Sequence, residues 1–575
     1  MTESSQTLNK HKKSFVTGAA ILAAAGIITK MMSGFFRIPL GNMIGAEGMA
    51  YYQTVYPIYS LLLVVATSGL PVAISKLISE KEADDDSYGM HRILHISIAM
   101  MLTFGLICAV VLFFGAEFLT NNIKDLNGSK WAMMAIAPAL LFVPMNGALR
   151  GYFNGTQSMV PTALSQVVEQ FFRVCSGLIM AYLLLHNGSA IAAAGAAGGA
   201  SVGALLGLIL LIVCYVFFTS SSTSLSSRKI QNEALYTGAT VPMASTESAA
   251  STESTESTRT TETRRMIIKR IISLAIPVTL GAAIMPIITI VDVILVPVRL
   301  SDAGFIADSV RVLYGQLTGF ASPIVNLPNV IVTSIAISIV PTIVRAHRAS
   351  DKNFLQDQIN LGIRIAMLIS LPCTVGIIAL ARPILLLLYP GQPIDAVSSA
   401  PAMMVLALGI AFLSLNQITT GVLQGISKAM IPIATMLVGI LVKILFTYVF
   451  TVIPSVNIIG AALGTTAAYV AATSINLYFV KRCSRVDIFM KKNILLPLLS
   501  SLIMGVITYG GYSLFLRFMS SNVATFVSIL LGGVTYIVAL FCTNSITRDD
   551  LMTFPKSEKL VLIYDTISKL LYNGK

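Results

Sequence analysis

Long apolar segments, separated by short polar ones, dominate the sequence. Fourteen of them have about 20 or more mostly apolar residues, which is the length that a helix needs to cross a bilayer. Because the apolar residues run on without alternation, they predict helices rather than the strands of a membrane barrel. The predicted spans are 15–38, 52–75, 93–119, 131–149, 160–186, 190–219, 267–298, 314–344, 358–389, 400–424, 431–454, 458–480, 493–516 and 522–542.

Composition leads to the same fold class. Of the 575 residues, 55% are hydrophobic and only 11% are charged, against roughly 25% charged residues in a soluble domain. The mean hydropathy is +0.80. We therefore expect an all-α polytopic membrane protein. A nucleic-acid partner is not expected despite the net charge of +13, because Lys and Arg lie between the apolar segments rather than in one patch.

The positions of the basic residues predict the topology. With the N-terminus in the cytoplasm, 28 of the 39 Lys and Arg fall in cytoplasmic segments and five in external loops. This bias follows the positive-inside rule, by which cytoplasmic loops carry an excess of Lys and Arg. Fourteen helices with both termini in the cytoplasm are therefore expected, in a bacterial plasma membrane.

One polar stretch divides the helices into two groups. Residues 220–266 are rich in Ser, Thr and Glu, a composition that buries little apolar surface and predicts a disordered cytoplasmic linker, with phosphorylation as an alternative role. The predicted domains are an N-lobe (1–219), this linker, a C-lobe (267–484), helices 13 and 14 (485–545) and an amphipathic cytoplasmic tail (546–575).

The two lobes are internal repeats. A shift of about 270 residues aligns helices 2, 4 and 6 with helices 8, 10 and 12. Pairs that coincide at this shift are Pro71 with Pro341, Asn146 with Asn416, Gly151 with Gly421 and Gly155 with Gly425. Since six helices separate the copies, both copies have the same orientation, which is a parallel repeat typical of secondary transporters. The repeat-related amides Asn146 and Asn416 are candidate substrate-binding groups.

Enzyme and metal signatures are missing from the sequence. No two of the six Cys form a CxxC, the five His have no ligand spacing, and no GxxxxGK[ST] occurs. We expect no catalytic residues, no metal site and no cofactor.

Ionisable residues inside spanning helices are costly and are therefore functional candidates. Lys30 and Arg37 lie seven residues apart on one face of helix 1, with no acid in that helix, and so predict an anion-binding site. Glu169 and Arg173 lie four apart on helix 5 and are expected to pair with each other, as a structural or a functional ion pair.

The second lobe adds two more charged candidates. Lys443 lies midway along helix 11 and is a candidate for the substrate path. Asp292 on helix 7 is either a cation-coupling group or the partner of a basic residue. Helix 7 also contains Pro277, Pro286 and Pro297, which predict a bending element for alternating access. The membrane potential, H⁺ or Na⁺ is the expected driving force.

Four motifs resemble those of one transporter superfamily. They are ITKMMSGFFRIPLGNMIGAEGMAYY (Ile28–Tyr52), GLPVAISK (Gly69–Lys76), LRGYFNGTQSMVPTALSQVVEQFFRV (Leu149–Val174) and GVLQGISKAMIP (Gly421–Pro432). With them the chain resembles the multidrug/oligosaccharidyl-lipid/polysaccharide (MOP) exporters, in the branch of the MurJ-type lipid II flippases and the stage V sporulation protein B group.

The resemblance implies two MATE-like six-helix lobes around a central cavity, with helices 13 and 14 forming a groove for a lipid tail. It implies cavity cations at Lys30 and Arg37, and it aligns Gln316 with an arginine that other members carry on helix 8. The expected function is that of a monomeric flippase, not an enzyme, for an undecaprenyl-diphosphate-linked cell-wall precursor. Lipid-linked glycan, bilayer and cell-wall synthesis machinery are the expected partners.

Three alternatives to this function stay open. The first is a flippase for another lipid-linked glycan, such as a capsule or teichoic-acid unit. The second is a multidrug or cation antiporter, which the basic rather than acidic helix 1 disfavours. The third is a membrane-embedded glycosyltransferase, which the short external loops disfavour because they leave little room for a catalytic site.

Overall fold

The computed structural model describes residues 2–84, 86–121, 125–236, 263–349, 351–543 and 545, and all regular structure in these residues is helical. The first half contains α1 (Thr2–Thr67), α2 (Leu70–Ala83), α3 (Ser87–Asn121), α4 (Ser129–Ile136), α5 (Ala139–Gly155), α6 (Met159–Leu184), the short η1 (Leu185–Asn187) and α7 (Ser189–Tyr236).

The second half is built in the same way. It contains α8 (Arg264–Asp302), α9 (Ala307–Gly315), η2 (Gln316–Ala321), α10 (Ser322–Arg348), α11 (Lys352–Ala379), α12 (Ala381–Leu388), α13 (Pro393–Gly425), α14 (Met430–Phe450) and α15 (Ile458–Ser484). The chain continues with η3 (Lys491–Leu495), α16 (Leu496–Phe515) and α17 (Ser521–Cys542). The labels η2 and η3 mark single π-helical turns.

The spanning helices confirm the predicted polytopic fold. In the described residues, 13 helices are long and apolar enough to cross a membrane. The first of them, Ala20–Ala83, is 64 residues long and covers two predicted spans, because the chain reverses at Gly45. Gly45 has φ 67° and ψ −175°, a backbone conformation that residues with a side chain rarely adopt. The 13 helices therefore correspond to the 14 predicted spans.

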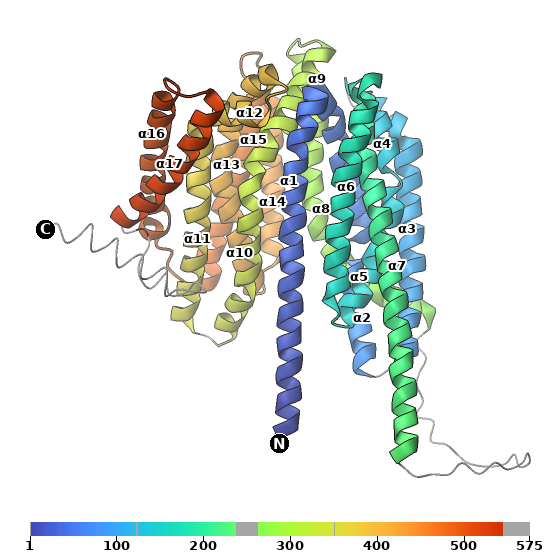
Figure 1. Cartoon of the computed structure of the whole chain (residues 1–575). Helices are drawn as coiled ribbons and strands as arrows, with labels where there is room; N and C mark the ends of the chain where they lie inside the picture. The colour runs from blue at the N-terminus through green and yellow to red at the C-terminus, as the bar shows by residue number, and fades with distance from the viewer. Residues whose placement is uncertain are drawn as a thin grey trace, which may run out of the picture.

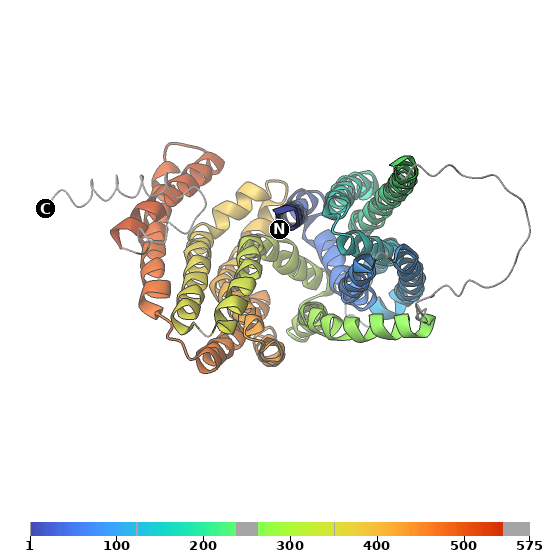
Figure 2. The ribbon, with the colours of Figure 1, turned by 90° about the horizontal axis from the view of Figure 1, so that it is seen from below.

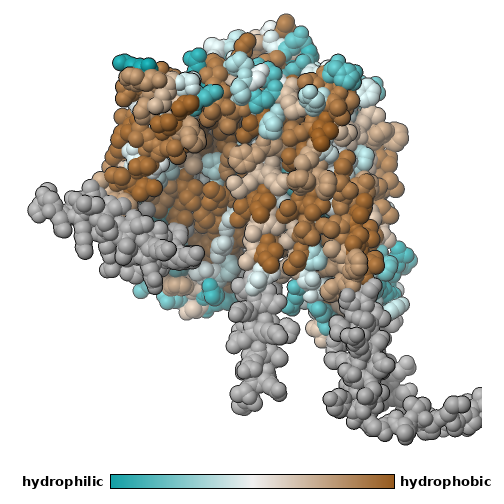
Figure 3. All heavy atoms as spheres, viewed as in Figure 1, coloured by the Kyte–Doolittle hydropathy of each residue, from teal (hydrophilic) through white to brown (hydrophobic). Residues whose placement is uncertain are grey.

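Two bundles of helices lie side by side around α1 (Figures 1 and 2). We call the end of the molecule that holds the start of α1 the inner end, and the opposite end, with the Gly45 turn, α9 and α12, the outer end (Figure 1). Figure 3 shows hydrophobic side chains around the middle of the molecule and polar ones gathered at both ends, as a membrane-spanning protein requires.

The glycines of α5 and α13 confirm that the halves are repeats. A Cβ atom added at Gly155 would lie 2.7 Å from the Cβ of Ile78, and one at Gly425 would lie 2.9 Å from the Cβ of Ile343. Gly151 approaches Ile74 as Gly421 approaches Ile339. The partner residues on α2 and α10 are thus separated by 265 residues, and not by the 270 that align the two prolines. The proline match in the sequence is five residues away from the register set by packing.

The two lobes share a core at the outer end only. One hydrophobic cluster there joins buried residues of α1, α4 and α7 to residues of η2, α12 and α13. Toward the inner end the buried residues form two separate clusters, one within the first lobe and one within the second. The structure is therefore closed between the lobes at its outer end, with separate lobe cores at its inner end.

Helix α8, with which the predicted C-lobe begins at residue 267, packs against both lobes. Its first turns place Ile267, Ile271 and Ala275 in the core of the first lobe. Further along, Ile284 and Ile288 pack against Ile440 of α14 in the second lobe. Figure 2 shows α8, in bright green, running along one side of the first lobe toward the middle of the molecule.

The structure also corrects the predicted linker at both ends. Helix α7 continues to Tyr236 rather than ending near residue 219, and α8 begins at Arg264. Residues 237–262 and the predicted tail 546–575 lie outside the described residues, so the disorder and amphipathic helix predicted there remain predictions.

Helices α16 and α17 stand outside the repeat, as the sequence predicts. They pack on each other and on α11 and α12. Figure 3 shows a hollow with a hydrophobic surface between α17 and the middle of the molecule. A lipid-tail groove at this place remains an expectation.

Candidate substrate cavity

A cavity of about 340 Å³ lies where α1 faces the second lobe. It is lined by α1, α8, α9, η2, α10, α13, α14 and α15, so that α1 is the one helix of the first lobe in its wall. Its volume is near the lower end of the range for ligand pockets, roughly 300–1,000 Å³. A substrate head group larger than this volume therefore fits only if the cavity widens.

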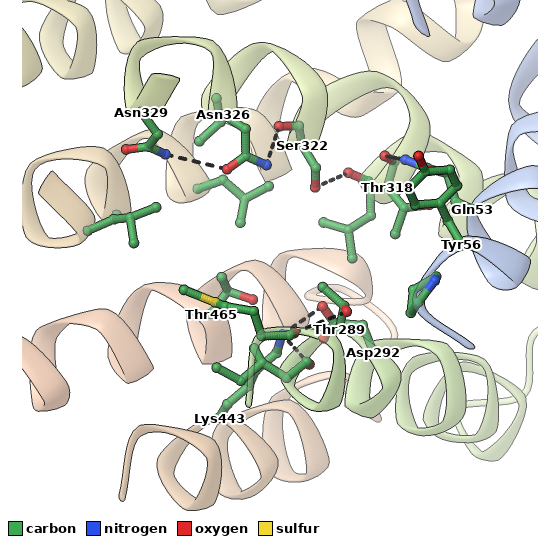
Figure 4. A pocket seen from close by; sticks show the side chains of 18 of the residues that line it. Gln53, Tyr56, Thr289, Asp292, Thr318, Ser322, Asn326, Asn329, Lys443 and Thr465 are labelled. Atoms are coloured by element: carbon green, nitrogen blue, oxygen red, sulfur yellow. Dashed lines mark hydrogen bonds and ion pairs between the residues drawn. The ribbon is translucent and has the colours of Figure 1, made fainter. Parts of the chain in front are cut away.

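One wall of the cavity is a row of uncharged polar side chains (Figure 4). Thr318, Ser322, Asn326 and Asn329 line the cavity at intervals of three or four residues along η2 and α10, and so share one helix face. The Nδ2 of Asn329 donates to the Oδ1 of Asn326 at 3.4 Å, and the buried Oδ1 of Asn329 has no hydrogen-bond partner in the part of the chain that the structure describes. Our sequence analysis missed this row. The spacing of these polar residues within an apolar span could have predicted that they share one helix face.

The opposite wall contains a buried ion pair (Figure 4). Lys443 of α14 lies 2.7 Å from the Oδ2 of Asp292 on α8, and its ammonium also donates to the backbone carbonyl of Ile288 at 3.2 Å. Lys443 is 1% exposed. Of the two roles left open for Asp292, the structure supports the partner of a basic residue.

Cations also lie on the first-lobe side of the cavity. Arg37 lines the cavity, and its guanidinium lies 5.9 Å from the centre of the Tyr56 ring. The guanidinium of Arg173 lies 5.1 Å from the same ring and donates to the Tyr56 hydroxyl. Among the described residues, neither arginine has a carboxylate within ion-pair distance. Two guanidinium groups thus flank one tyrosine at the cavity edge.

Lys30 lies apart from this cluster. Its side chain is exposed and does not line the cavity. It lies seven residues before Arg37 on the same face of α1, about 10 Å nearer the inner end at 1.5 Å per residue. The face shared by Lys30 and Arg37 therefore leads from the inner end toward the cavity.

Glu169 has a different partner from the one predicted. Its Oε2 lies 2.6 Å from the guanidinium of Arg150 on α5. The Nδ2 of Asn146 contacts the same oxygen at 3.4 Å and donates to the carbonyl of Ala204 on α7 at 3.0 Å. Glu169 and Arg173 share one face of α6, as their spacing predicts, but Arg150 of the neighbouring helix α5 is the cation that pairs with Glu169.

The two asparagines hold helices together and do not line the cavity. Asn146 joins α5 to α6 and α7, as described above. Asn416 of α13 accepts a hydrogen bond from Asn476 of α15 at 2.8 Å, and Asn476 in turn accepts one from Thr435 of α14 at 2.8 Å. Both residues are at most 1% exposed. The substrate-binding role predicted for them has no support from this geometry.

Gln316 belongs to the contact that closes the outer end. Its Nε2 donates to the Oδ1 of Asp395 at 3.1 Å, while the other carboxylate oxygen accepts from the backbone N–H of Ala46, next to the Gly45 turn, at 3.2 Å. Asn42 donates to the carbonyl of Leu388 at 2.8 Å. These bonds join α1 to the second lobe, and Gln316 does not line the cavity.

A second group of outer contacts surrounds Glu47. Its Oε1 lies 3.1 Å from the Nε of Arg311 on α9, and its Oε2 accepts from Ser189 of α7 at 3.0 Å. Deeper, the Nε2 of Gln53 donates to the carbonyl of Thr318 at 2.6 Å. We call these contacts, together with those of Gln316, the outer gate. Our sequence analysis missed it, because nothing in the spacing of these residues brings the two lobes together.

In the part of the chain that the structure describes, no group of three His, Cys, Asp or Glu could hold a metal ion. The six cysteines are free thiols.

Comparison with known proteins identifies the family. Residues 15–347, more than half of the chain, match the family described as polysaccharide biosynthesis protein. The chain belongs to this family. Residues 318–449 also match the MatE family. The chain is therefore an exporter of the MOP superfamily, in its MurJ-like branch.

Similar proteins span almost the full length of the chain. The stage V sporulation protein B of Bacillus subtilis (strain 168) is 26% identical over 96% of this chain and 99% of its own length. The lipid II flippase MurJ of the same organism is 26% identical over 90% of this chain and 94% of its own length. A solved structure of lipid II flippase MurJ in an inward closed conformation has a TM-score of 0.65 and 17% identity, covering 90% of this chain and 98% of its own.

Proposed function

We propose that this protein moves an undecaprenyl-diphosphate-linked cell-wall precursor, of the lipid II kind, from the inner to the outer leaflet of a bacterial plasma membrane. The observation that carries the proposal is the guanidinium of Arg37, which borders the cavity without a carboxylate partner among the described residues. A diphosphate provides the oxygen acceptors that a guanidinium fork binds. The names of the similar flippases point to the same substrate class.

The chemistry of the cavity supports a substrate with an anionic group and hydroxyl groups. Arg37, Lys443 and Asp292 leave the lining with an excess of one positive charge. The uncharged row from Thr318 to Asn329 offers hydroxyl and amide groups that suit the hydroxyls of a sugar. A cationic drug fits this lining poorly, because the one carboxylate in it is already paired with Lys443.

Alternating access is the proposed mechanism. A shared core at the outer end and separate cores at the inner end are what a state open to the cytoplasm requires. In the opposite state the outer gate would break and the inner ends of the lobes would meet. We propose cytoplasmic termini, the membrane potential or a H⁺ or Na⁺ gradient as the driving force, and no resident cofactor.

The test combines depletion with reconstitution. On depletion in its host, an undecaprenyl-diphosphate-linked peptidoglycan precursor should accumulate on the inner leaflet. Accumulation of a capsule or teichoic-acid precursor instead would refute the proposed substrate. Purified protein in liposomes should flip a fluorescent undecaprenyl-diphosphate glycan.

Substitutions of Arg37 test in the same flipping assay whether its side chain binds the substrate. Arg37→Ala should abolish flipping, while Arg37→Lys should retain part of it because the charge is kept and the bidentate geometry lost. Arg517→Ala, at an exposed arginine between α16 and α17, is the matched control and should flip at the parent rate. Full flipping by Arg37→Ala would refute the role of this side chain.

A further inference from the structure

Helix α8 is fixed to the first lobe near its start. Arg270 forms an ion pair with Glu80 of α2 at 2.6 Å. A Cβ atom added at Gly69 would lie 2.2 Å from the carbonyl oxygen of Ala275, so the two backbones are in direct contact. With the burial of Ile271 in the core of the first lobe, these contacts make the inner part of α8 move with that lobe.

The middle of α8 is joined to the second lobe by a small apolar contact and one ion pair. The apolar contact consists of the buried Ile284, Ile288 and Ile440, with partly buried apolar residues around them. Near the outer end of α8, Arg299 also donates to the carbonyl of Tyr448 on α14 at 3.0 Å. The ammonium of Lys443 adds two bonds to α8, one to the carboxylate of Asp292 at 2.7 Å and one to the carbonyl of Ile288 at 3.2 Å. Breaking the ion pair would therefore free the middle of α8 from its polar attachment to α14, while the contact of Arg299 still holds its outer end.

This ion pair borders the cavity. Asp292 and Lys443 both line it, on the wall opposite the polar row (Figure 4). The pair is also incompletely satisfied, because the buried Oδ1 of Asp292 has no hydrogen-bond partner among the described residues. An anion that enters the cavity can therefore reach the one buried ammonium that ties α8 to α14.

We propose that the Asp292–Lys443 ion pair is a clasp that the phosphate of the substrate opens. This inference rests on the proposed function. One phosphate of the diphosphate replaces the Asp292 carboxylate as the counter-ion of Lys443, while Arg37 binds the other. Asp292 is left negative beside the phosphate, and the repulsion between them moves the middle of α8 away from α14. Because the inner part of α8 is held by the first lobe, release of the clasp frees the two lobes to rock against each other.

The test measures the distance between α8 and α14 with and without ligand. Spin labels at Ile294→Cys on α8 and Leu441→Cys on α14, both exposed positions, are placed in a background without the six native cysteines. In nanodiscs, undecaprenyl diphosphate should add a population with a longer label-to-label distance. Asp292→Asn should show that population without ligand, because a neutral amide holds the ammonium weakly.

Two further variants keep the test decisive. Asp292→Leu/Lys443→Met removes both charges together, which avoids a buried unpaired ion and favours folding. In this variant the ligand-induced shift in distance should be lost. Thr103→Val, at an exposed position of α3 that does not line the cavity, is the control and should keep the shift.

The outcomes distinguish the clasp from the proposed function. Binding and flipping of the substrate with an unchanged α8–α14 distance would overturn the clasp and leave the proposed function standing. A ligand-induced shift that persists in Asp292→Leu/Lys443→Met would also overturn the clasp. Wild-type protein that neither binds undecaprenyl diphosphate nor flips its glycan would overturn both proposals.

Discussion

A single methyl group at Gly315 should open the outer gate. A Cβ atom at this position would lie 1.8 Å from the carbonyl oxygen of Ala46 and 2.6 Å from its carbonyl carbon, and both are backbone atoms that no rotamer change can move. Real Cβ contacts are essentially never shorter than 3.0 Å, so in Gly315→Ala the outer end of α1 must retreat from α9 by about 1.2 Å. The hydrogen bond from Ala46 to Asp395 lies in the same contact and would be strained with it.

The magnitude follows from the cost of overpacking a tightly packed contact, about 1–3 kcal/mol. If the variant avoids this cost by opening outward, the ratio of open to closed protein rises roughly 5- to 150-fold. The reporter is Ser322→Cys, which lies in the cavity behind the gate, in a background without native cysteines. A membrane-impermeant maleimide added from outside should label it faster in Gly315→Ala by a factor in that range.

A glycine without close neighbours provides the control. Gly26 of α1 has nothing within 4 Å of its added Cβ, so Gly26→Ala should leave the labelling rate unchanged. Thermal unfolding of each purified variant checks that the protein is folded. Labelling of folded Gly315→Ala at the parent rate would show that the contact between α1 and α9 does not control access from outside.

Three further predictions concern the gate, the linker and the first lobe. A disulfide or bifunctional crosslink between Glu47→Cys and Arg311→Cys should lock the outer gate and stop flipping in liposomes, and flipping at the uncrosslinked rate would contradict the rocking mechanism. Deletion of residues 245–256, which include the sequence STES twice (Ser245–Ser248 and Ser251–Ser254), should leave flipping and membrane abundance unchanged, whereas loss of flipping at normal abundance would indicate a regulatory role. Arg150→Met should lower the thermal unfolding temperature more than Arg150→Met/Glu169→Gln does, because only the single variant leaves a carboxylate unpaired in the lobe interior; equal losses would mean that the pair adds nothing.

The spanning helices could be predicted because the bilayer imposes their length and composition. Spans predicted at 93–119 and 458–480 lie within α3 and α15, which continue past the apolar segment, whereas α14 ends at Phe450, before the predicted end at residue 454. Helix α7 continues furthest beyond its predicted span, into residues that are no longer apolar. Hydropathy detects the segment that needs lipid, and the backbone is free to stay helical beyond it.

The partners of the charged residues could be predicted only in part. Spacing along one helix indicates which side chains share a face, and this placed Glu169 and Arg173 together. The partner of Glu169 was decided by Arg150, 19 residues earlier on a neighbouring helix, and sequence spacing contains no information on that contact. For Lys443 and Asp292, 151 residues apart, the sequence left a basic partner as one of two roles for Asp292, but it did not identify Lys443 as that partner.

The chemistry of the outer gate explains how a closed contact can also be reversible. The ion pair of Glu47 with Arg311 is polar, and Glu47 is 41% exposed in its side chain, so these two groups can exchange each other for water at small cost when the gate opens. The apolar part of the contact behaves differently, because separating Met49 from Gly319 exposes buried surface at roughly 25 cal/mol per Å². Opening outward must therefore be offset by burial elsewhere, and the separate lobe cores at the inner end are where new apolar contact can form. Since α8 joins the core of the first lobe to α14 of the second, it is the element whose release would link the two ends.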